Sequence, residues 1–309
     1  MKFGAIILFS LAATLSVVSA APLAKQAPSI VPGAFFDRFF VIVLENKDYT
    51  QVAANSYFRS LAKKGTLLTN YHGTTHPSQP NYIAMMSGDV HGFFHDKLHS
   101  YRVKNLVDLL EPKGISWKSY QENYPGHCYR KEDAFKELYV RKHNPFMSFV
   151  NVRTNPARCA RIVHARELET DLANNDLPQF SFYTPNMKND GHDTKVPFVA
   201  KWLKGFIEPK LNNPNFMDKT AILITFDEDD SEERKNKNRV YTILLGGAVR
   251  SPPGTKDNTP YNHYSVLATL EKNWDLGDLG KKDTEATPFQ NLGDLDNNDV
   301  EDTPFEEFG

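Results

Sequence analysis

Acidic and amide side chains follow two apolar stretches that are predicted to be buried strands. Glu45 and Asn46 come after the first of these stretches, and Asp227 and Glu228 come after the stretch at residues 220–226. Carboxylates that are held close together repel one another, so burial without a cation would raise the pKa of one of them. Oxygen ligands of this kind suit hard divalent cations. We therefore expect a divalent metal site, of unknown metal identity and number, while a solvated acidic turn remains the alternative.

Ser78 is predicted to cap the N-terminus of a helix that has Pro80 in its first turn. A hydroxyl at such a position faces free backbone N–H groups and the positive end of the helix dipole, which favours phosphate binding. A hydroxyl beside a metal could also ionise and attack phosphorus. An ordinary capping serine is the alternative. For Asp229 and Asp230, further along the second acidic segment, we favour a solvated turn.

Several histidines and one further aspartate are candidates for a second cluster. Asp190 and His192 flank Gly191, and His263 opens the last predicted helix. A glycine between two ligands permits a tight turn. Each residue alone is more often structural, but together they favour a metal site. His143 could bind phosphate oxygens or protonate a leaving group near neutral pH, with a structural loop histidine as the alternative.

Strand and helix patterns alternate along the chain and position these residues. The clearest patterns predict strands over 36–44, 180–183 and 220–226 and helices over 199–207 and 263–274. This alternation indicates an α/β fold with a mainly parallel central sheet and helices on both faces. Sites in such sheets gather at the carboxyl ends of the strands, where the acidic residues fall. We predict one domain over residues 21–282.

The two ends of the chain differ in composition from this domain. Lys2, an apolar run and the small residues Val18, Ser19 and Ala20 predict a signal peptide over residues 1–20. A membrane anchor is the alternative, but the run is short for a span. We expect a secreted, extracellular protein without stable membrane insertion. Residues 283–309 contain nine Asp or Glu and no Lys or Arg, which predicts an acidic, flexible tail.

Composition limits the classes of function. A chain with 40% hydrophobic and 24% charged residues is neither a disordered protein nor a coiled coil. The formal net charge of −2 gives no overall basic excess for nucleic acid, although the body without its ends is mildly basic. Two cysteines exclude a zinc site built from cysteines alone. Secretion would favour a disulfide between Cys128 and Cys159.

Four short motifs occur in an order that is typical of one family. They are Val43–Asn46, His76–Tyr82, Lys142–Phe146 and Thr225–Glu228. Over most of residues 36–274, the chain resembles the phosphoesterase family of secreted acid phosphatases and bacterial-type phospholipases C, within the alkaline-phosphatase-like superfamily. The resemblance implies a metal-dependent enzyme that hydrolyses monoesters of a small phosphorylated substrate.

The resemblance also implies roles for individual residues. Ser78 becomes the nucleophile, with Thr75 in reserve, and Gly88 matches a glycine that follows the helix in related phosphodiesterases. His143 is expected to help in catalysis, and Asn81 and His76 are expected to bind substrate. The first metal would be held by Glu45, Asn46, Asp227 and Glu228, and a second by Asp190, His192 and His263. The superfamily usually has Asp-His where this chain has Asp227-Glu228, so zinc is less strongly implied.

Other functions remain open at this point. A phospholipase C or another phosphodiesterase could use the same site, and Phe93 and Phe94 are candidates for lipid contact. A secreted binding protein that has lost the chemistry is the alternative of another class, and metal bound to the purified protein would argue against it. A serine esterase is disfavoured because the chain has no Gly-x-Ser-x-Gly motif.

Overall fold

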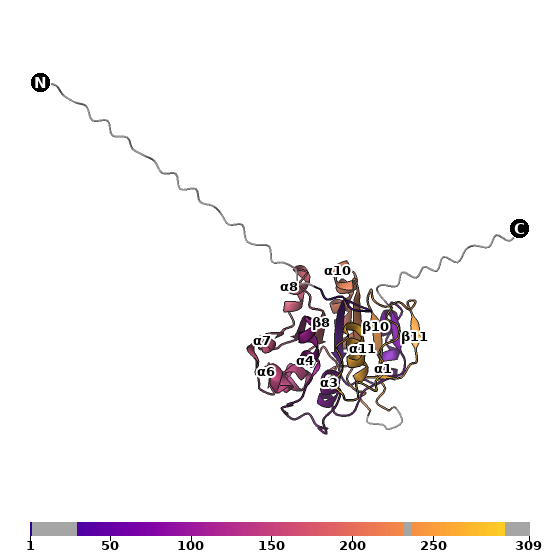
Figure 1. Cartoon of the computed structure of the whole chain (residues 1–309). Helices are drawn as coiled ribbons and strands as arrows, with labels where there is room; N and C mark the ends of the chain where they lie inside the picture. The colour runs from indigo at the N-terminus through magenta and orange to yellow at the C-terminus, as the bar shows by residue number, and fades with distance from the viewer. Residues whose placement is uncertain (2–29, 232–236, 294–309) are drawn as a thin grey trace.

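The computed structural model, which describes Met1 and residues 30–231 and 237–293, has an eight-stranded sheet at its centre (Figure 1). The strand order is β11-β2-β10-β9-β1-β8-β4-β7. Strand β10 runs antiparallel to both of its neighbours, and the other neighbouring pairs are parallel. The strands are β1 (Arg38–Leu44), β2 (Thr66–Leu68), β4 (Trp117–Gln121), β7 (Ile162–His164), β8 (Phe180–Thr184), β9 (Thr220–Phe226), β10 (Thr242–Leu245) and β11 (Thr255–Asp257).

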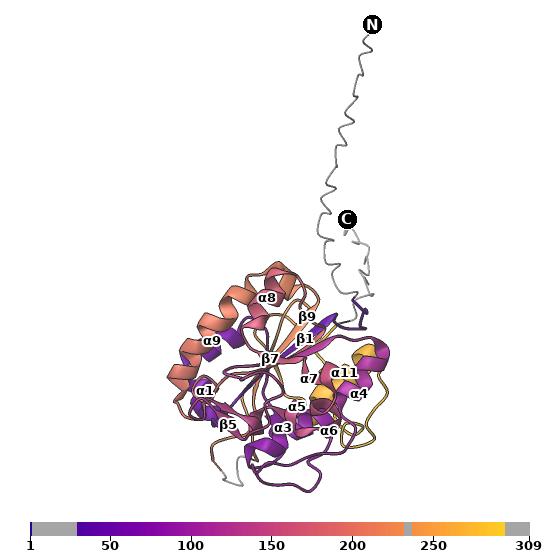
Figure 2. The same ribbon diagram turned by 90° about the vertical axis from the view of Figure 1, so that its left-hand side faces the viewer.

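Helices cover both faces of this sheet. Figure 2 shows α8 and α9 on one side of the strands and α4 and α11 on the other. The predicted α/β class with a mainly parallel sheet is confirmed. The helices are α1 (Tyr49–Ala54), α2 (Ser56–Ala62), α3 (Ser78–Ser87), α4 (Leu106–Leu110), α5 (Pro145–Ser148), α6 (Val150–Arg153), α7 (Pro156–Cys159), α8 (Glu167–Ala173), α9 (Val196–Leu211), α10 (Pro214–Met217) and α11 (Tyr264–Trp274), with 3-10 turns η1 (Glu111–Lys113) and η2 (Arg141–His143).

The central strands β1 and β9 are apolar along almost their whole length because helices cover both of their faces. Their parallel register pairs Leu44 with Phe226. The backbone N–H of Asp227 then donates to the Leu44 carbonyl at 2.9 Å. This register sets Glu45 beside Asp227 at the carboxyl edge of the sheet. Two small ribbons flank the sheet, β3 (Tyr71–His72) with β12 (Tyr261–Asn262) and β5 (Asp133–Ala134) with β6 (Tyr139–Val140).

The segment from residue 283 to residue 293 differs from the flexible tail that we expected there. Asp283 is buried and accepts hydrogen bonds from the backbone N–H groups of Leu279 and Lys281. Phe289 and Leu292 are buried in the main core, because these apolar residues give the segment surface to bury. The rest of the acidic tail and the predicted signal peptide lie outside the described residues.

The predicted disulfide is confirmed. Cys128 and Cys159 are bonded, with their Cα atoms 5.8 Å apart. The bond closes a loop with a sequence separation of 31 residues, which stabilises the fold by about 3–4 kcal/mol in the chain-entropy model. Within residues 30–231 and 237–293, no helix has both the length and the apolar character needed to cross a membrane.

Candidate active site

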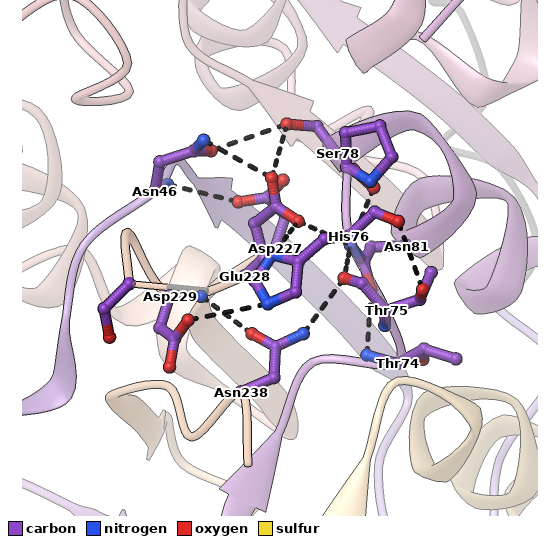
Figure 3. Close-up of polar contacts among 12 residues, drawn as sticks. Asn46, Thr74, Thr75, His76, Ser78, Asn81, Asp227, Glu228, Asp229 and Asn238 are labelled. Atoms are coloured by element: carbon purple, nitrogen blue, oxygen red, sulfur yellow. Dashed lines mark hydrogen bonds and ion pairs between the residues drawn. The ribbon is translucent and has the colours of Figure 1, made fainter. Parts of the chain in front are cut away.

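The acidic residues that follow β1 and β9 meet at the carboxyl edge of the sheet, and Figure 3 shows most of them. Asn46 turns the chain after β1 with φ of 39°. Its backbone N–H donates to Asp227 Oδ1 at 3.2 Å, and its side-chain Nδ2 donates to Glu228 Oε1 at 3.3 Å. Glu45, Asp227 and Glu228 are all buried. Two strand ends that lie far apart in the sequence therefore form one acidic cluster.

Ser78 points into this cluster. Its Oγ lies 3.1 Å from Glu45 Oε2, 3.2 Å from Glu228 Oε1 and 3.4 Å from Asn46 Oδ1. The predicted capping role is wrong, because Pro77 occupies the cap position and Ser78 is the first residue of α3. The hydroxyl is thereby free of a capping bond and is directed at carboxylates. Helix α3 ends at Gly88, whose φ of 69° explains the glycine there.

Asn81 shapes the loop that precedes Ser78. Its Oδ1 accepts from the backbone N–H groups of Thr74 and Thr75 at 2.8 and 3.0 Å, and its Nδ2 donates to the Thr75 carbonyl at 2.7 Å. A longer contact of 3.5 Å joins Nδ2 to Glu228 Oε2. The reserve nucleophile Thr75 donates its own hydroxyl to the His76 carbonyl. Asn81 thus fixes the loop, while its substrate contact stays a prediction.

His76 and Asp229 form the flank of the cluster nearest that loop. His76 Nδ1 lies 2.7 Å from Glu228 Oε2, and Nε2 lies 3.6 Å from Asp229 Oδ1. The solvated turn that we favoured is wrong for Asp229, which is 2% exposed. It is correct for Asp230, which is exposed. Burial raises the pKa of Asp229 to about 6, although the neighbouring His76 acts in the opposite direction.

Burial and mutual repulsion perturb the acids at the strand ends. Burial raises the pKa of Glu45 well above its ordinary value, and the charges of Asp227 and Asp190 raise it further. Burial also raises the pKa of Asp227 to about 8, with the charge of Glu228 adding to the effect. The Tyr82 hydroxyl donates to Glu45 Oε1. A group that removes negative charge from this cluster would therefore be bound favourably.

His143 lies behind Glu45, away from solvent. Its Nε2 is 3.3 Å from Glu45 Oε1, its Nδ1 is 3.5 Å from Asp190 Oδ2, and its ring stacks on Tyr82 with 5.1 Å between centroids. The residue is 1% exposed, and burial lowers its pKa well below the ordinary value. The His143 ring therefore lies against Glu45 and Asp190, and its Nε2 has no hydrogen-bond partner. The expected roles in phosphate binding or proton transfer stay predictions.

Of the three residues expected at a second metal, Asp190 and His192 lie together and His263 lies apart. The Asp190 carbonyl accepts from the Glu45 backbone N–H at 3.0 Å. The His192 ring lies 2.9 Å from Asp193 Oδ1 through its Nδ1. His263 is buried with Nε2 2.5 Å from the Asp227 carbonyl, and burial lowers its pKa to about 4. The His192 backbone N–H donates to Asp190 Oδ1 at 2.8 Å, whereas the described contacts of His263 involve neither of these two residues. Gly191, with φ of 112°, is required because a Cβ atom there would lie 3.1 Å from the Glu45 carbonyl oxygen.

The oxygen atoms around Ser78 fit a hard divalent cation in their chemistry. Asp227 Oδ2 is buried without a hydrogen-bond partner, and the nearby acids have raised pKa values. In the described part of the chain, no group of three or more His, Cys, Asp or Glu side chains is arranged so that it could hold a metal ion. The fit therefore rests on a mixed oxygen set that includes a hydroxyl and an amide. Its members are Glu45, Asn46, Ser78, Asp227 and Glu228.

Sequence reasoning missed three residues of this site. Tyr82 lies one helical turn after Ser78, so the spacing of four residues could have placed it on the same face. Asp229 and Asn238 belong to a charged loop that resembles an ordinary solvated turn. Asn238 Oδ1 accepts from the Asp229 backbone N–H at 2.8 Å, and its Nδ2 donates to the Thr75 carbonyl at 3.0 Å. No local pattern signals that long-range contact.

Comparison with known proteins now decides the family. The model of the Phosphoesterase family matches residues 43–277. The chain belongs to the phosphoesterase family. The matched range contains the whole acidic cluster, Ser78 and α11.

Curated members of the phosphoesterase family show which reaction class this is. The chain is 45% identical to a probable acid phosphatase of Kluyveromyces lactis and 41% identical to an acid phosphatase of Aspergillus fumigatus, over 88% and 90% of this chain. It spans 67% of the length of each of these relatives. It is also 31% identical to a phosphatidylinositol-3-phosphatase of Mycobacterium tuberculosis, over 87% of both chains. The chain is a phosphoric ester hydrolase of the phosphatase type.

Solved structures agree on the fold of this phosphoesterase. A protein of the alkaline phosphatase superfamily from Vibrio parahaemolyticus matches with a TM-score of 0.57 at 14% identity, over 88% of this chain and 76% of that chain. A phosphonate monoester hydrolase of Agrobacterium radiobacter matches with a TM-score of 0.52 at 11% identity, over 78% and 73%. At these identities the likeness concerns the fold alone.

Proposed function

We propose that this chain is a secreted, metal-dependent phosphatase that hydrolyses phosphate monoesters through Ser78. One observation carries the proposal: the Ser78 hydroxyl lies 3.1 and 3.2 Å from oxygens of two buried glutamates, Glu45 and Glu228. A serine that serves only the fold has no need of two buried carboxylates. The similarity to acid phosphatases supports the reaction class.

In the first step, Ser78 Oγ attacks phosphorus and the bond from phosphorus to the ester oxygen breaks. The alcohol leaves with a proton, and a phosphoserine remains. Carboxylate oxygens of Glu45 and Glu228 lie within hydrogen-bond reach of the Ser78 proton. The N-terminus of α3 directs the positive end of its helix dipole toward the phosphoryl oxygens, although the Gln79 N–H in that turn already donates to Asp96 Oδ1.

A divalent metal would be held by Glu45, Asn46, Asp227 and Glu228 together with Ser78. When bound, it supplies positive charge that lowers the pKa of a hydroxyl and offsets the charge of phosphoryl oxygens. The Tyr82 hydroxyl keeps Glu45 in position through Oε1, which leaves Oε2 facing Ser78.

In the second step, water attacks the phosphoserine, the bond from phosphorus to Ser78 Oγ breaks, and inorganic phosphate leaves. His76 lies at the edge of the cluster with its side chain 31% exposed. That exposure lets His76 contact substrate, whereas Glu45 is fully buried. The predicted signal peptide supports secretion, and the disulfide is consistent with an oxidising compartment.

The test is hydrolysis of p-nitrophenyl phosphate by the full chain, from about pH 4 to 8, with and without a chelator. We expect turnover that a chelator removes and added divalent metal restores. Ser78→Ala should reduce kcat by at least about 1000-fold with an unchanged circular dichroism spectrum. Thr75→Val is the matched control and should stay within about tenfold of the unmodified protein. Full activity of Ser78→Ala would refute the nucleophile, and chelator-resistant turnover would refute the metal.

A phosphodiesterase or phospholipase C is the second candidate. Phe94 and Leu98 are 58% and 44% exposed. They lie on the loop whose His95 and Lys97 carbonyls accept hydrogen bonds from the Gln79 side chain, next to Ser78. Faster turnover of a diester or a phosphocholine analogue than of the monoester would favour this candidate. Absence of turnover of any substrate with metal added would favour a binding protein.

A further inference from the structure

We infer that Lys142 binds the phosphoryl group of the substrate and makes the enzyme prefer monoesters to diesters. The inference rests on the proposed function, because it assigns a specificity residue to the site around Ser78. It concerns a residue to which the sequence motifs gave no role.

Lys142 is joined to the first turn of α3 through a single carboxylate. Its Nζ lies 2.9 Å from Asp96 Oδ2, and Asp96 Oδ1 accepts from the Gln79 backbone N–H at 2.9 Å. Gln79 directly follows Ser78. The ammonium group is thus held beside the start of the helix that carries the nucleophile.

The segment that carries Lys142 also contacts the site through His143 and Glu45. His143, the next residue along the chain, lies 3.3 Å from Glu45 Oε1, and Glu45 Oε2 lies 3.1 Å from Ser78 Oγ. The Lys142 ammonium group is paired with the Asp96 carboxylate at 2.9 Å, and a lysine paired in this way carries its positive charge near neutral pH.

The ammonium group can reach a ligand. The Lys142 side chain is 19% exposed, whereas Ser78 is 1% exposed and Glu45 is fully buried. Besides Asp96, its described contact is His192 Nε2 at 3.5 Å, which is long for a hydrogen bond. Lys47, another lysine near this edge, is 7% exposed and donates to the Asn46 carbonyl at 2.7 Å. Lys142 is the better placed of the two lysines to meet an incoming anion.

The charge of the site explains why a lysine is needed there. The buried acids repel a phosphate monoester, which is a dianion near neutral pH, and a divalent cation offsets only part of that negative charge. A charge-assisted hydrogen bond from an ammonium group to a phosphoryl oxygen supplies the rest. In a diester, one of those oxygens carries a second ester group and no charge. Lys142 therefore favours the monoester over the diester.

The test compares kcat/KM for p-nitrophenyl phosphate and for methyl p-nitrophenyl phosphate in Lys142→Met, Lys142→Arg and the unmodified protein. We expect Lys142→Met to lose about 100-fold on the monoester and less than about fivefold on the diester. Inhibition by inorganic phosphate should weaken in parallel. Lys142→Arg keeps the charge and should retain most of the preference.

Two controls separate substrate binding from other effects. Lys97→Met removes an exposed cation from the same loop as Asp96, and both rates should stay within about twofold because exposed charges are strongly screened. Asp96→Asn removes the anchor of Lys142 but keeps the cation, so the monoester preference should persist. If Asp96→Asn loses the preference as Lys142→Met does, Lys142 is only an anchor and the inference is wrong.

The remaining outcomes are distinguishable from failure of the proposed function. Equal losses on both substrates in Lys142→Met, or a preference lost in Lys142→Arg as completely as in Lys142→Met, would overturn the inference while Ser78→Ala remained inactive. An active Ser78→Ala would instead overturn the proposed function. Melting temperature checks that each variant is folded, and Lys142→Gln replaces Lys142→Met as the deciding variant if the latter does not fold.

Discussion

Two buried acidic sites in this molecule are built in opposite ways. Asp171, beside β4, is 5% exposed and has its cation at hand, because Lys118 Nζ lies 2.6 and 2.8 Å from its two oxygens. The Tyr120 hydroxyl adds a bond of 2.5 Å. At the ends of β1 and β9, Glu45 and Asp227 are fully buried and contact a hydroxyl, backbone N–H groups, an imidazole and each other's charge.

The difference shows what each acid does. A buried carboxylate with a lysine beside it is compensated within the chain, so it contributes to the fold without a ligand. A buried carboxylate among other carboxylates destabilises the free protein and favours binding of a cation. Under the proposed function, the acidic cluster lowers the stability of the free protein, and a bound cation would restore it.

The largest expected effect comes from the uncompensated cluster. Asp227→Asn should reduce turnover of a phosphate monoester by at least about 1000-fold. Without divalent metal, the same change removes a repelling charge and should leave the free energy of unfolding unchanged or higher by about 1–2 kcal/mol. Steady-state kinetics and urea unfolding in chelator measure the two effects. A strongly destabilised Asp227→Asn protein would contradict the proposed difference between the acidic cluster and the Asp171 site.

Substitution at Asp171 should have the opposite effect, lowering stability and leaving turnover unchanged. Asp171→Asn leaves Lys118 with its charge unpaired and should lower the free energy of unfolding by about 3 kcal/mol. Turnover of the folded fraction should be unchanged, because Asp171 lies away from Ser78. Glu167→Gln, on the same helix and exposed, is the control and should stay within about 0.5 kcal/mol. An inactive yet stable Asp171→Asn protein would refute this assignment.

Divalent metal should stabilise the protein through the cluster alone. At a concentration about 100 times the dissociation constant, binding adds about 2.7 kcal/mol to the free energy of unfolding. The melting temperature of the unmodified protein and of Asp171→Asn should rise on addition of metal, and that of Asp227→Asn should not. Equal rises in all three proteins would place the metal elsewhere.

The smallest expected effect concerns a third buried acidic site, formed by Glu271 and Asp283. Burial raises the pKa of Glu271 to about 8, and the charge of Asp283 adds to the effect. Between its ordinary value of 4.5 and about 8, folded protein holds this proton and unfolded protein releases it. The stabilisation is therefore complete below the unfolded pKa and is lost as the pH rises through the folded pKa.

Glu271→Gln should remove this dependence. As the pH rises from 5 to 8, the free energy of unfolding of the unmodified protein should fall by about 2 kcal/mol more than that of Glu271→Gln. Urea unfolding across this range measures the difference. Glu285→Gln, exposed on the neighbouring segment, should follow the unmodified protein, and identical curves for all three would contradict the prediction.

The fold could be predicted because its central strands carry strong local signals. The apolar runs at β1 and β9 specify strands that are buried on both faces, and the polar residues that follow them mark the carboxyl edge. Register then brings Glu45 and Asp227 together. The disulfide was predictable because the chain has only two cysteines.

The features that could not be predicted depend on contacts between distant segments. Asp229 is buried because Asn238 and His76 close over it, although its neighbours in sequence are charged. His143 is hidden by its stacking on Tyr82 and its place beside Glu45. Nothing in the local pattern reveals either burial. Ser78 sits one residue later in its helix than expected because Pro77 takes the cap position.

The packed segment after residue 276 contacts the C-terminal end of α3. The Lys282 backbone N–H donates to the Gly88 carbonyl at 3.0 Å, and a Cβ atom on Gly88 would lie 2.5 Å from Asp283 Oδ1. The last packed residues of the chain are thereby mechanically coupled to α3, which begins at Ser78. A protease cut between residues 277 and 282 would remove this contact, so loss of activity after limited digestion would show that the C-terminal end of α3 has to be held in place for turnover.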